Sequence, residues 1–261
     1  MLGALTRYVA AAILALALLS CSSEDSQPHP KQATETQATE QQTTAEQAIE
    51  KPPPVYVSLG DSLAVGVGAS DPQERGYAPL YRDALAEEAR REVRFVQLGV
   101  SGETSESFIN YPHRTSSQLA RAERVLKRYP GATVTLSLGA NDLLRTADGT
   151  DAEHEAAVAN YGQNLDYILK RLRGASDPEP RIAVLALYNP APGSFTDEWV
   201  GRLNGEIRAV ARENGASVAA GDRAFHRGHE REYVHYPGDI HPTDEGYAAL
   251  ARAFERATGL A

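Results

Sequence analysis

The chain has 261 residues, of which 42% are hydrophobic and 23% are charged, and its formal net charge is −9 at pH 7. This composition is typical of a globular protein, and the acidic balance disfavours nucleic-acid binding, which needs a basic surface. The single cysteine excludes an intramolecular disulfide and any site built from several thiolates.

The first twenty residues have the pattern of a secretory signal. Arg7 is followed by an apolar run, Val9–Leu19, which is too short to span a membrane but suits the centre of a signal peptide. The next residues, Ser20-Cys21, complete a sequence that resembles a bacterial lipobox, in which the cysteine is lipidated. We expect residues 1–20 to be a lipoprotein signal peptide and Cys21 to anchor the protein to the outer face of a bacterial membrane. The alternative is an ordinary signal peptide followed by an unrelated cysteine.

Residues 21–54 have a different composition from the rest of the chain. Gln, Thr, Glu, Ser and Pro dominate after Cys21, and Ile49 is the only large aliphatic residue. Such a segment buries too little apolar surface to offset the entropy of folding. We therefore expect residues 21–54 to be a disordered tether that carries the lipidated cysteine, and residues 55–261 to form the folded domain.

From Val55 onward, short apolar runs alternate with longer amphipathic segments. The expected strands are 55–59, 93–100, 132–138, 181–187 and 216–220. The expected helices are 77–91, 116–129, 152–172, 198–214 and 243–257. This alternation predicts one doubly wound α/β/α sandwich around a mostly parallel five-stranded sheet. Ligands bind such sheets beyond the carboxyl ends of the strands, so functional residues are expected in those loops.

Four short motifs stand at these strand ends or just before the last helix. They are Gly60-Asp61-Ser62-Leu63, Gly99-Val100-Ser101-Gly102, Gly139-Ala140-Asn141-Asp142 and Gly238-Asp239-Ile240-His241. With these four blocks in this order, the chain resembles the SGNH hydrolase superfamily of GDSL-type lipases and esterases. The resemblance covers nearly all of residues 55–261 and implies a flavodoxin-like fold and a serine esterase.

Ser62 and His241 are the candidate nucleophile and base. A serine hydroxyl attacks a carbonyl only when a base within hydrogen-bond reach takes its proton, and a histidine can do so near neutral pH. Ser62 lies on a glycine-flanked turn after the first strand, where its ordinary alternative role is to cap the next helix. His241 is the best candidate of seven histidines because Pro242 restrains the chain and Thr243 can cap the following helix. The alternative is a histidine with only a surface or capping role.

The resemblance also implies an oxyanion hole. Its donors would be the backbone N–H groups of Ser62 and Gly102 and the side-chain amide of Asn141. Two of these residues also suit a purely structural role, because Gly102 can serve a turn with positive φ and Asn141 can close an Asx turn.

The acid partner of the histidine departs from the family pattern. The family places an aspartate three residues before the histidine, where this chain has Gly238, while Asp239 stands two residues before His241. Residues i and i+2 of an extended segment point the same way, so Asp239 can still reach the imidazole. Two alternatives stay open: a backbone carbonyl that orients His241 in a Ser–His dyad, and Asp222 after the fifth strand.

Other kinds of site fit the sequence less well. The glycine-rich stretch 60–68 lacks the ending of a phosphate-binding loop. A metal site could be built from His226, His229, His235 and His241. Such a site is disfavoured, because the spacing of these histidines matches no helical pair and arginines lie nearby. We therefore expect no metal or organic cofactor, no nucleic-acid partner, and a monomer.

The expected function is hydrolysis of carboxylic esters through an acyl-enzyme. The substrate would be lysophospholipid-like or another ester of a short or medium acyl chain. Two alternatives remain: a deacetylase acting on cell-wall or other carbohydrate esters, and a non-catalytic surface lipoprotein that only binds its ligand. The loops around the motifs do not decide among these substrates.

Overall fold

The computed structural model describes residues 52–225 and 230–260, so residues 1–20, Cys21 and most of the expected tether lie outside the described residues. Within the described part, five strands form one parallel sheet in the order β2-β1-β3-β4-β5. The strands are β1 (Val55–Gly60), β2 (Arg94–Gln97), β3 (Thr133–Ser137), β4 (Arg181–Ala186) and β5 (Ser217–Ala220). The predicted fold class is confirmed, and every strand pair in this sheet is parallel.

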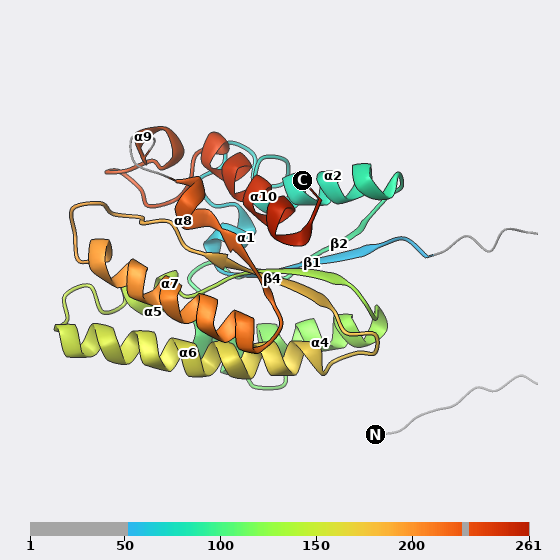
Figure 1. Cartoon of the computed structure of the whole chain (residues 1–261), viewed down its shortest axis with the longest axis horizontal. Helices are drawn as coiled ribbons and strands as arrows, with labels where there is room; N and C mark the ends of the chain where they lie inside the picture. Colours follow the sequence, from blue (N-terminus) through green and yellow to red (C-terminus); the bar gives the residue numbers. More distant parts are fainter. Residues whose placement is uncertain (1–51, 226–229, 261) are drawn as a thin grey trace, which may run out of the picture. The chain divides into compact units, whose positions relative to one another are not determined.

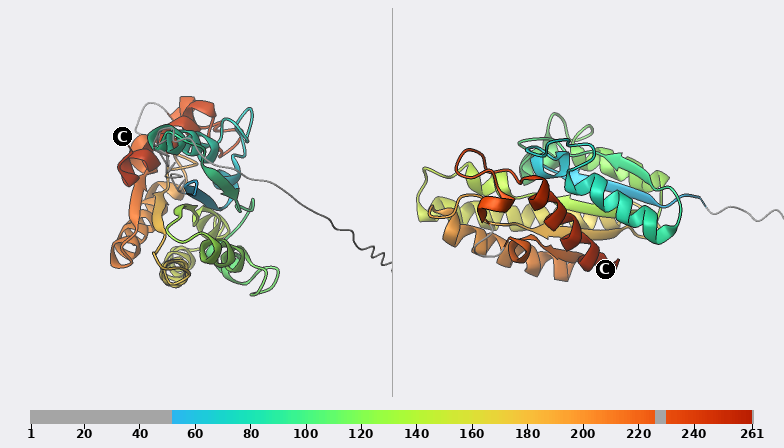
Figure 2. Two further views of the ribbon diagram at one scale, coloured as in Figure 1. Left: turned by 90° about the vertical axis from the view of Figure 1, so that its right-hand side faces the viewer. Right: turned by 90° about the horizontal axis from the view of Figure 1, so that it is seen from above.

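Helices cover both faces of the sheet (Figure 1). Helices α2 (Tyr77–Ala89) and α10 (Asp244–Thr258) lie on one face, and Figure 2 shows the other layer on the opposite side. That second layer consists of α4 (Gln118–Arg128), α6 (Asp151–Arg173) and α7 (Thr196–Glu213). Short helices in the loops were not expected from the sequence: α1 (Ser62–Val65), α3 (Ser105–Asn110), α5 (Ala140–Leu144), α8 (Gly221–Ala224) and α9 (Glu230–Tyr233).

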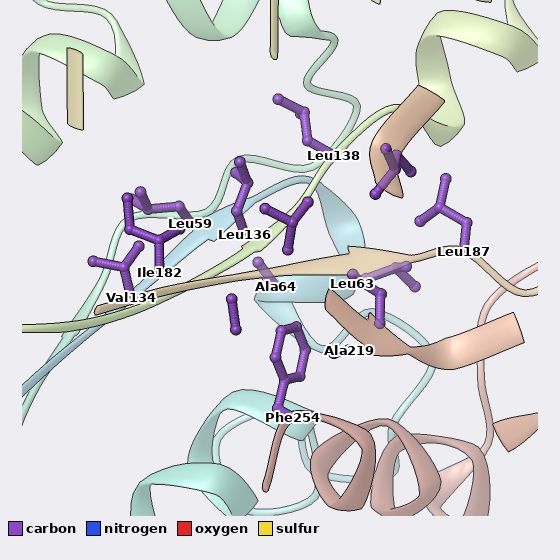
Figure 3. Close-up of a cluster of buried hydrophobic side chains, with 14 of the residues drawn as sticks. Leu59, Leu63, Ala64, Val134, Leu136, Leu138, Ile182, Leu187, Ala219 and Phe254 are labelled. Carbon is purple, nitrogen blue, oxygen red and sulfur yellow. The ribbon is translucent and has the colours of Figure 1, made fainter. Parts of the chain in front are cut away.

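The core lies between the sheet and the two helix layers. The inner strands β1, β3 and β4 are buried on both faces, including their polar residues Ser58, Thr133, Thr135 and Ser137. In Figure 3, Phe254 points from α10 toward the sheet and the leucines of the inner strands. The Phe254 ring also stacks on Tyr77 of α2, with ring centroids 4.8 Å apart. Burial of each large apolar side chain stabilises the fold by roughly 1.5–3 kcal/mol.

The order of the strands determines where loops can meet. The chain passes from β1 outward to β2 and then returns past β1 to β3, so the crevice of the sheet opens at the carboxyl ends of β1 and β3. β1 leads into Ser62, β2 into Gly102 and β3 into Asn141. The loop before α10 brings His241 to the same edge.

The second strand is shorter than predicted. The expected strand 93–100 spans only Arg94–Gln97. The next donor of β1, Gly60 N–H, bonds to the side chain of Gln118 at 2.7 Å instead of to this strand. Val100 N–H still donates to the Gly60 carbonyl at 2.9 Å, so this segment stays beside β1 beyond the strand.

Among the described residues, no helix combines the length and apolar character needed to cross a membrane.

Candidate active site

Ser62 is the first residue of α1, directly after β1. The N-cap of this helix is Asp61, whose Oδ1 accepts a hydrogen bond from Leu63 N–H at 3.0 Å. Ser62 therefore does not cap the helix itself. Its hydroxyl instead lies 2.9 Å from the Nε2 of His241, 179 residues away in the sequence.

His241 is held in a turn between α9 and α10. Val234 and Pro242 form an antiparallel bridge, and His235 N–H donates to the His241 carbonyl at 3.1 Å. Thr243 caps α10 by accepting a hydrogen bond from Gly246 N–H at 3.2 Å, as the sequence suggested. These contacts fix the backbone on both sides of the imidazole, and they leave Nε2 directed at Ser62.

Asp239 lies at the other nitrogen of the imidazole. Its Oδ1 is 2.7 Å from His241 Nδ1 and also accepts a hydrogen bond from Ile240 N–H at 2.7 Å. Although partial burial raises the pKa of Asp239, the hydrogen bond and charge of His241 hold it below its usual value. Asp239 is thus ionised near neutral pH. The other candidate acid, Asp222, is paired with Arg208 at 2.6 Å instead.

The two remaining motif residues line the same cavity as Ser62 and His241. This cavity has a volume of about 160 Å³ and contains both Gly102 and Asn141 in its wall. Gly102 has a φ of +79°, and Asn141 Nδ2 donates one hydrogen to the Glu103 carbonyl at 2.9 Å. The second hydrogen on Nδ2 is therefore available to a ligand. The rest of the wall is mainly apolar: Leu63, Leu144, Leu187, Tyr188, Pro190 and Ile240.

Larger grooves lie elsewhere on the described surface, including one of about 600 Å³ between α4 and α6. The four motifs nevertheless meet at the smaller cavity, so we place the candidate site there. The histidines of the disfavoured metal site do not gather around the cavity as the four motifs do. His226 and His229 lie outside the described residues, and His235 Nε2 contacts the Gly68 carbonyl at 2.9 Å. In the described part of the chain, no three metal-binding side chains gather where they could hold an ion.

Three buried or half-buried carboxyl groups lie at the cavity: Asp61 is in its wall, and Glu103 and Asp142 directly follow the wall residues Gly102 and Asn141. Burial, together with the charges of Asp142 and Glu103, raises the pKa of Asp61 to about 7, although the hydrogen bond from Leu63 opposes this shift. Burial also raises the pKa of Asp142, against the hydrogen bonds that it accepts from Ser105. Asp142 stands in the third motif but was given no role from the sequence, and the only sequence signal for Glu103 is that it directly follows Gly102.

Comparison with known proteins agrees with this arrangement. Residues 58–249 match the GDSL-like Lipase/Acylhydrolase family. The chain belongs to this family. This GDSL-type protein is therefore a carboxylic ester hydrolase. It is 29% identical over 216 residues to the spore germination lipase LipC of Bacillus licheniformis, a match that covers 77% of this chain and 95% of that protein.

Solved structures share the fold of this GDSL-type hydrolase. The lipase Lip_vut3 from a goat rumen metagenome has a TM-score of 0.64 at 24% identity, over 78% of this chain and 97% of the other. The acetylxylan esterase Axe2 of Geobacillus stearothermophilus has a TM-score of 0.60 at 17% identity, over 79% and 94%. At these identities, the likeness shows the shared α/β sandwich.

Proposed function

We propose that this hydrolase cleaves carboxylic esters through an acyl-enzyme formed on Ser62. The observation that carries the proposal is the continuous chain of hydrogen bonds from Asp239 through His241 to Ser62, at 2.7 Å and 2.9 Å. Ser62 also faces a cavity that contains Gly102 and Asn141. All of these groups come from one chain, so we propose that a monomer suffices.

In the proposed mechanism, Ser62 Oγ attacks the ester carbonyl while His241 Nε2 takes the hydroxyl proton. Asp239 holds Nδ1–H and stabilises the imidazolium that forms. The backbone N–H groups of Ser62 and Gly102 and the amide of Asn141 donate to the oxyanion. His241 then returns its proton to the leaving alcohol. A water molecule, deprotonated by His241, releases the acid and restores Ser62.

The size of the cavity favours esters of short acyl chains. Its volume of about 160 Å³ is small against the roughly 300–1,000 Å³ of pockets that enclose larger ligands. The apolar wall suits an alkyl group, and the exposure of Gly102 leaves room for a larger alcohol outside. We propose that short acyl esters, including acetyl esters of carbohydrates, are better substrates than long-chain lysophospholipids.

The test is hydrolysis of p-nitrophenyl esters from acetyl to palmitoyl by the purified protein and its Ser62→Ala variant. We expect the highest kcat/KM for the short esters, and loss of both turnover and labelling by a fluorophosphonate when Ser62 is replaced. Full turnover by a folded Ser62→Ala variant would overturn the proposed nucleophile. A binding protein without catalysis would show no turnover in either form.

We also propose that Cys21 carries a lipid anchor and that residues 21–54 link it to the domain. Support comes from the sequence around Cys21 and from the place where the chain enters the domain. β1 begins at Val55, at the opposite end of the strand from α1, which Ser62 begins (Figure 1). We propose that a link entering the domain there does not obstruct the cavity. When the protein is expressed in a bacterial host, we expect the wild type in the membrane fraction and the Cys21→Ser variant outside it. Unchanged membrane retention would contradict the anchor.

A further inference from the structure

Gln118 is a buried amide that joins two loops of the active site. It is the first residue of α4, and only 1% of its surface is exposed. Its side chain forms three hydrogen bonds, two to the backbone of Gly60 and one to the carboxylate of Glu103. No sequence pattern singles out this residue, because a polar side chain at the start of a helix usually faces solvent.

The contact with Gly60 fixes the segment that presents the nucleophile. Gly60 N–H donates to Gln118 Oε1 at 2.7 Å, and Gln118 Nε2 donates to the Gly60 carbonyl at 2.9 Å. The side-chain amide thus satisfies the N–H of the last residue of β1 and shares its carbonyl with the N–H of Val100. Ser62 follows only two residues later, so the direction in which the chain leaves β1 sets the position of its hydroxyl.

The contact with Glu103 fixes the segment that presents two oxyanion donors. Gln118 Nε2 donates to Glu103 Oε2 at 2.9 Å, and Ser107 Oγ donates to Oε1. The backbone carbonyl of the same Glu103 accepts the hydrogen bond from Asn141. Glu103 also directly follows Gly102. Restraint of this one residue therefore restrains both Gly102 and Asn141.

We infer that Gln118 is a positioning residue that sets the distance between the nucleophile and the oxyanion donors, an inference that rests on the proposed function. An oxyanion donor is effective within about 2.7–3.1 Å of the developing charge. A displacement of about 1 Å in an active site can lower the rate roughly 100-fold. The backbone bond from Val100 to Gly60 joins the two segments at the end of β1. Gln118 adds the connection beyond the sheet, at Glu103.

The first test is Gln118→Met, which keeps the length of the side chain and removes all three hydrogen bonds. We expect kcat for p-nitrophenyl acetate to fall about 10- to 100-fold, while KM changes by less than about three-fold. The control is Asn214→Leu. Asn214 is a buried amide at the other end of the sheet, bonded to Asp166 and Val210. Both variants are assayed well below their Tm values.

A similar loss of kcat in both variants, or none in Gln118→Met, would overturn the inference. A second test keeps a polar side chain at position 118, whereas methionine removes the partner of the buried polar groups around it. Gln118→Glu places a carboxylate against Glu103, and adding Glu103→Gln restores an amide–carboxylate pair in the reverse sense. The bond from position 118 to the Gly60 carbonyl is lost in both variants, so their comparison isolates the contact with Glu103. We expect the double variant to recover kcat relative to Gln118→Glu alone; no recovery would count against the inference.

Failure of this inference can be told apart from failure of the proposed function. If Gln118 variants keep full kcat while Ser62→Ala abolishes turnover and fluorophosphonate labelling, only the positioning role is wrong. If the wild-type protein neither hydrolyses the ester nor becomes labelled, both the function and the positioning role are wrong.

Discussion

The Oγ of Ser62 and the Nε2 of His241 lie 2.9 Å apart, although 179 positions separate them in the chain. The two residues meet because β1 ends at the edge of the sheet where the loop before α10 also returns. Asp239 extends the contact to a third side chain.

Asp239→Asn is expected to lower kcat by about 10³- to 10⁴-fold, because the amide cannot stabilise the imidazolium as a carboxylate does. The measurement is the rate of p-nitrophenyl acetate hydrolysis near neutral pH. Asp222→Asn is the matched control, since Asp222 pairs with Arg208 and has no contact with His241 among the described interactions. A loss of less than about ten-fold in Asp239→Asn would favour a Ser–His dyad instead.

Asn141→Ala is expected to lower kcat about 10²- to 10³-fold with little change in KM, because the amide would bind the oxyanion more strongly than the ground-state carbonyl. Steady-state kinetics on a short ester measure both constants. Thermal unfolding of the same variant checks that loss of the bond to the Glu103 carbonyl has not unfolded the protein. An effect confined to KM would contradict a role in the oxyanion hole.

Asp61 is expected to make stability depend on pH. Its pKa is about 7 in the folded protein, against an ordinary value of 3.8, mainly because the carboxyl is buried. Between these pH values the unfolded chain has released a proton that the folded protein retains. The free energy of unfolding therefore falls as the pH rises, by up to about 1.4 kcal/mol for each pH unit, and the loss is complete above pH 7.

Asp61→Asn removes this titration and keeps an oxygen to cap α1, since asparagine is an equally good N-cap residue. The unfolding free energy of the variant relative to wild type should therefore increase between about pH 4 and about pH 7. Urea unfolding at several pH values measures the difference. Curves that stay parallel for the two proteins would show that Asp61 has an ordinary pKa.

Gly68→Ala is expected to lower kcat by at least about ten-fold by displacing His241. A Cβ at position 68 would lie 2.8 Å from the Cβ of His241 and 3.0 Å from the Pro242 carbonyl oxygen. The φ of +93° adds backbone strain for any other residue. Gly259→Ala is the control, since its φ is +78° and a Cβ there meets no atom within 4 Å.

Kinetics and Tm of both glycine variants separate displacement of His241 from strain. Gly259→Ala should lower Tm and leave kcat unchanged, because α10 ends far from the cavity. Equal effects of the two substitutions on kcat would mean that strain alone, and not contact with His241, causes the loss in Gly68→Ala.

Much of the fold could be read from local patterns. Strands β1, β3 and β4 were each expected within one or two residues of their observed ends, because short segments rich in apolar and β-branched residues are bounded there by proline or glycine. The edge strand β2 was predicted too long because Gly60 N–H of β1 bonds to the side chain of Gln118, which is distant in sequence, instead of extending the ladder. Short helices such as α5 give too few residues for a helical period to show.

The amino-acid sequence by itself determined the α/β sandwich, the family, and the positions of Ser62, Gly102, Asn141 and His241, because periodicity and short motifs are local properties of a chain. Only the tertiary structure placed Asp239, rather than Asp222, beside His241. It also decided that Gln118 and Asp61 are buried. Burial and partner choice depend on segments that are distant in sequence, and no local pattern records which of them pack together.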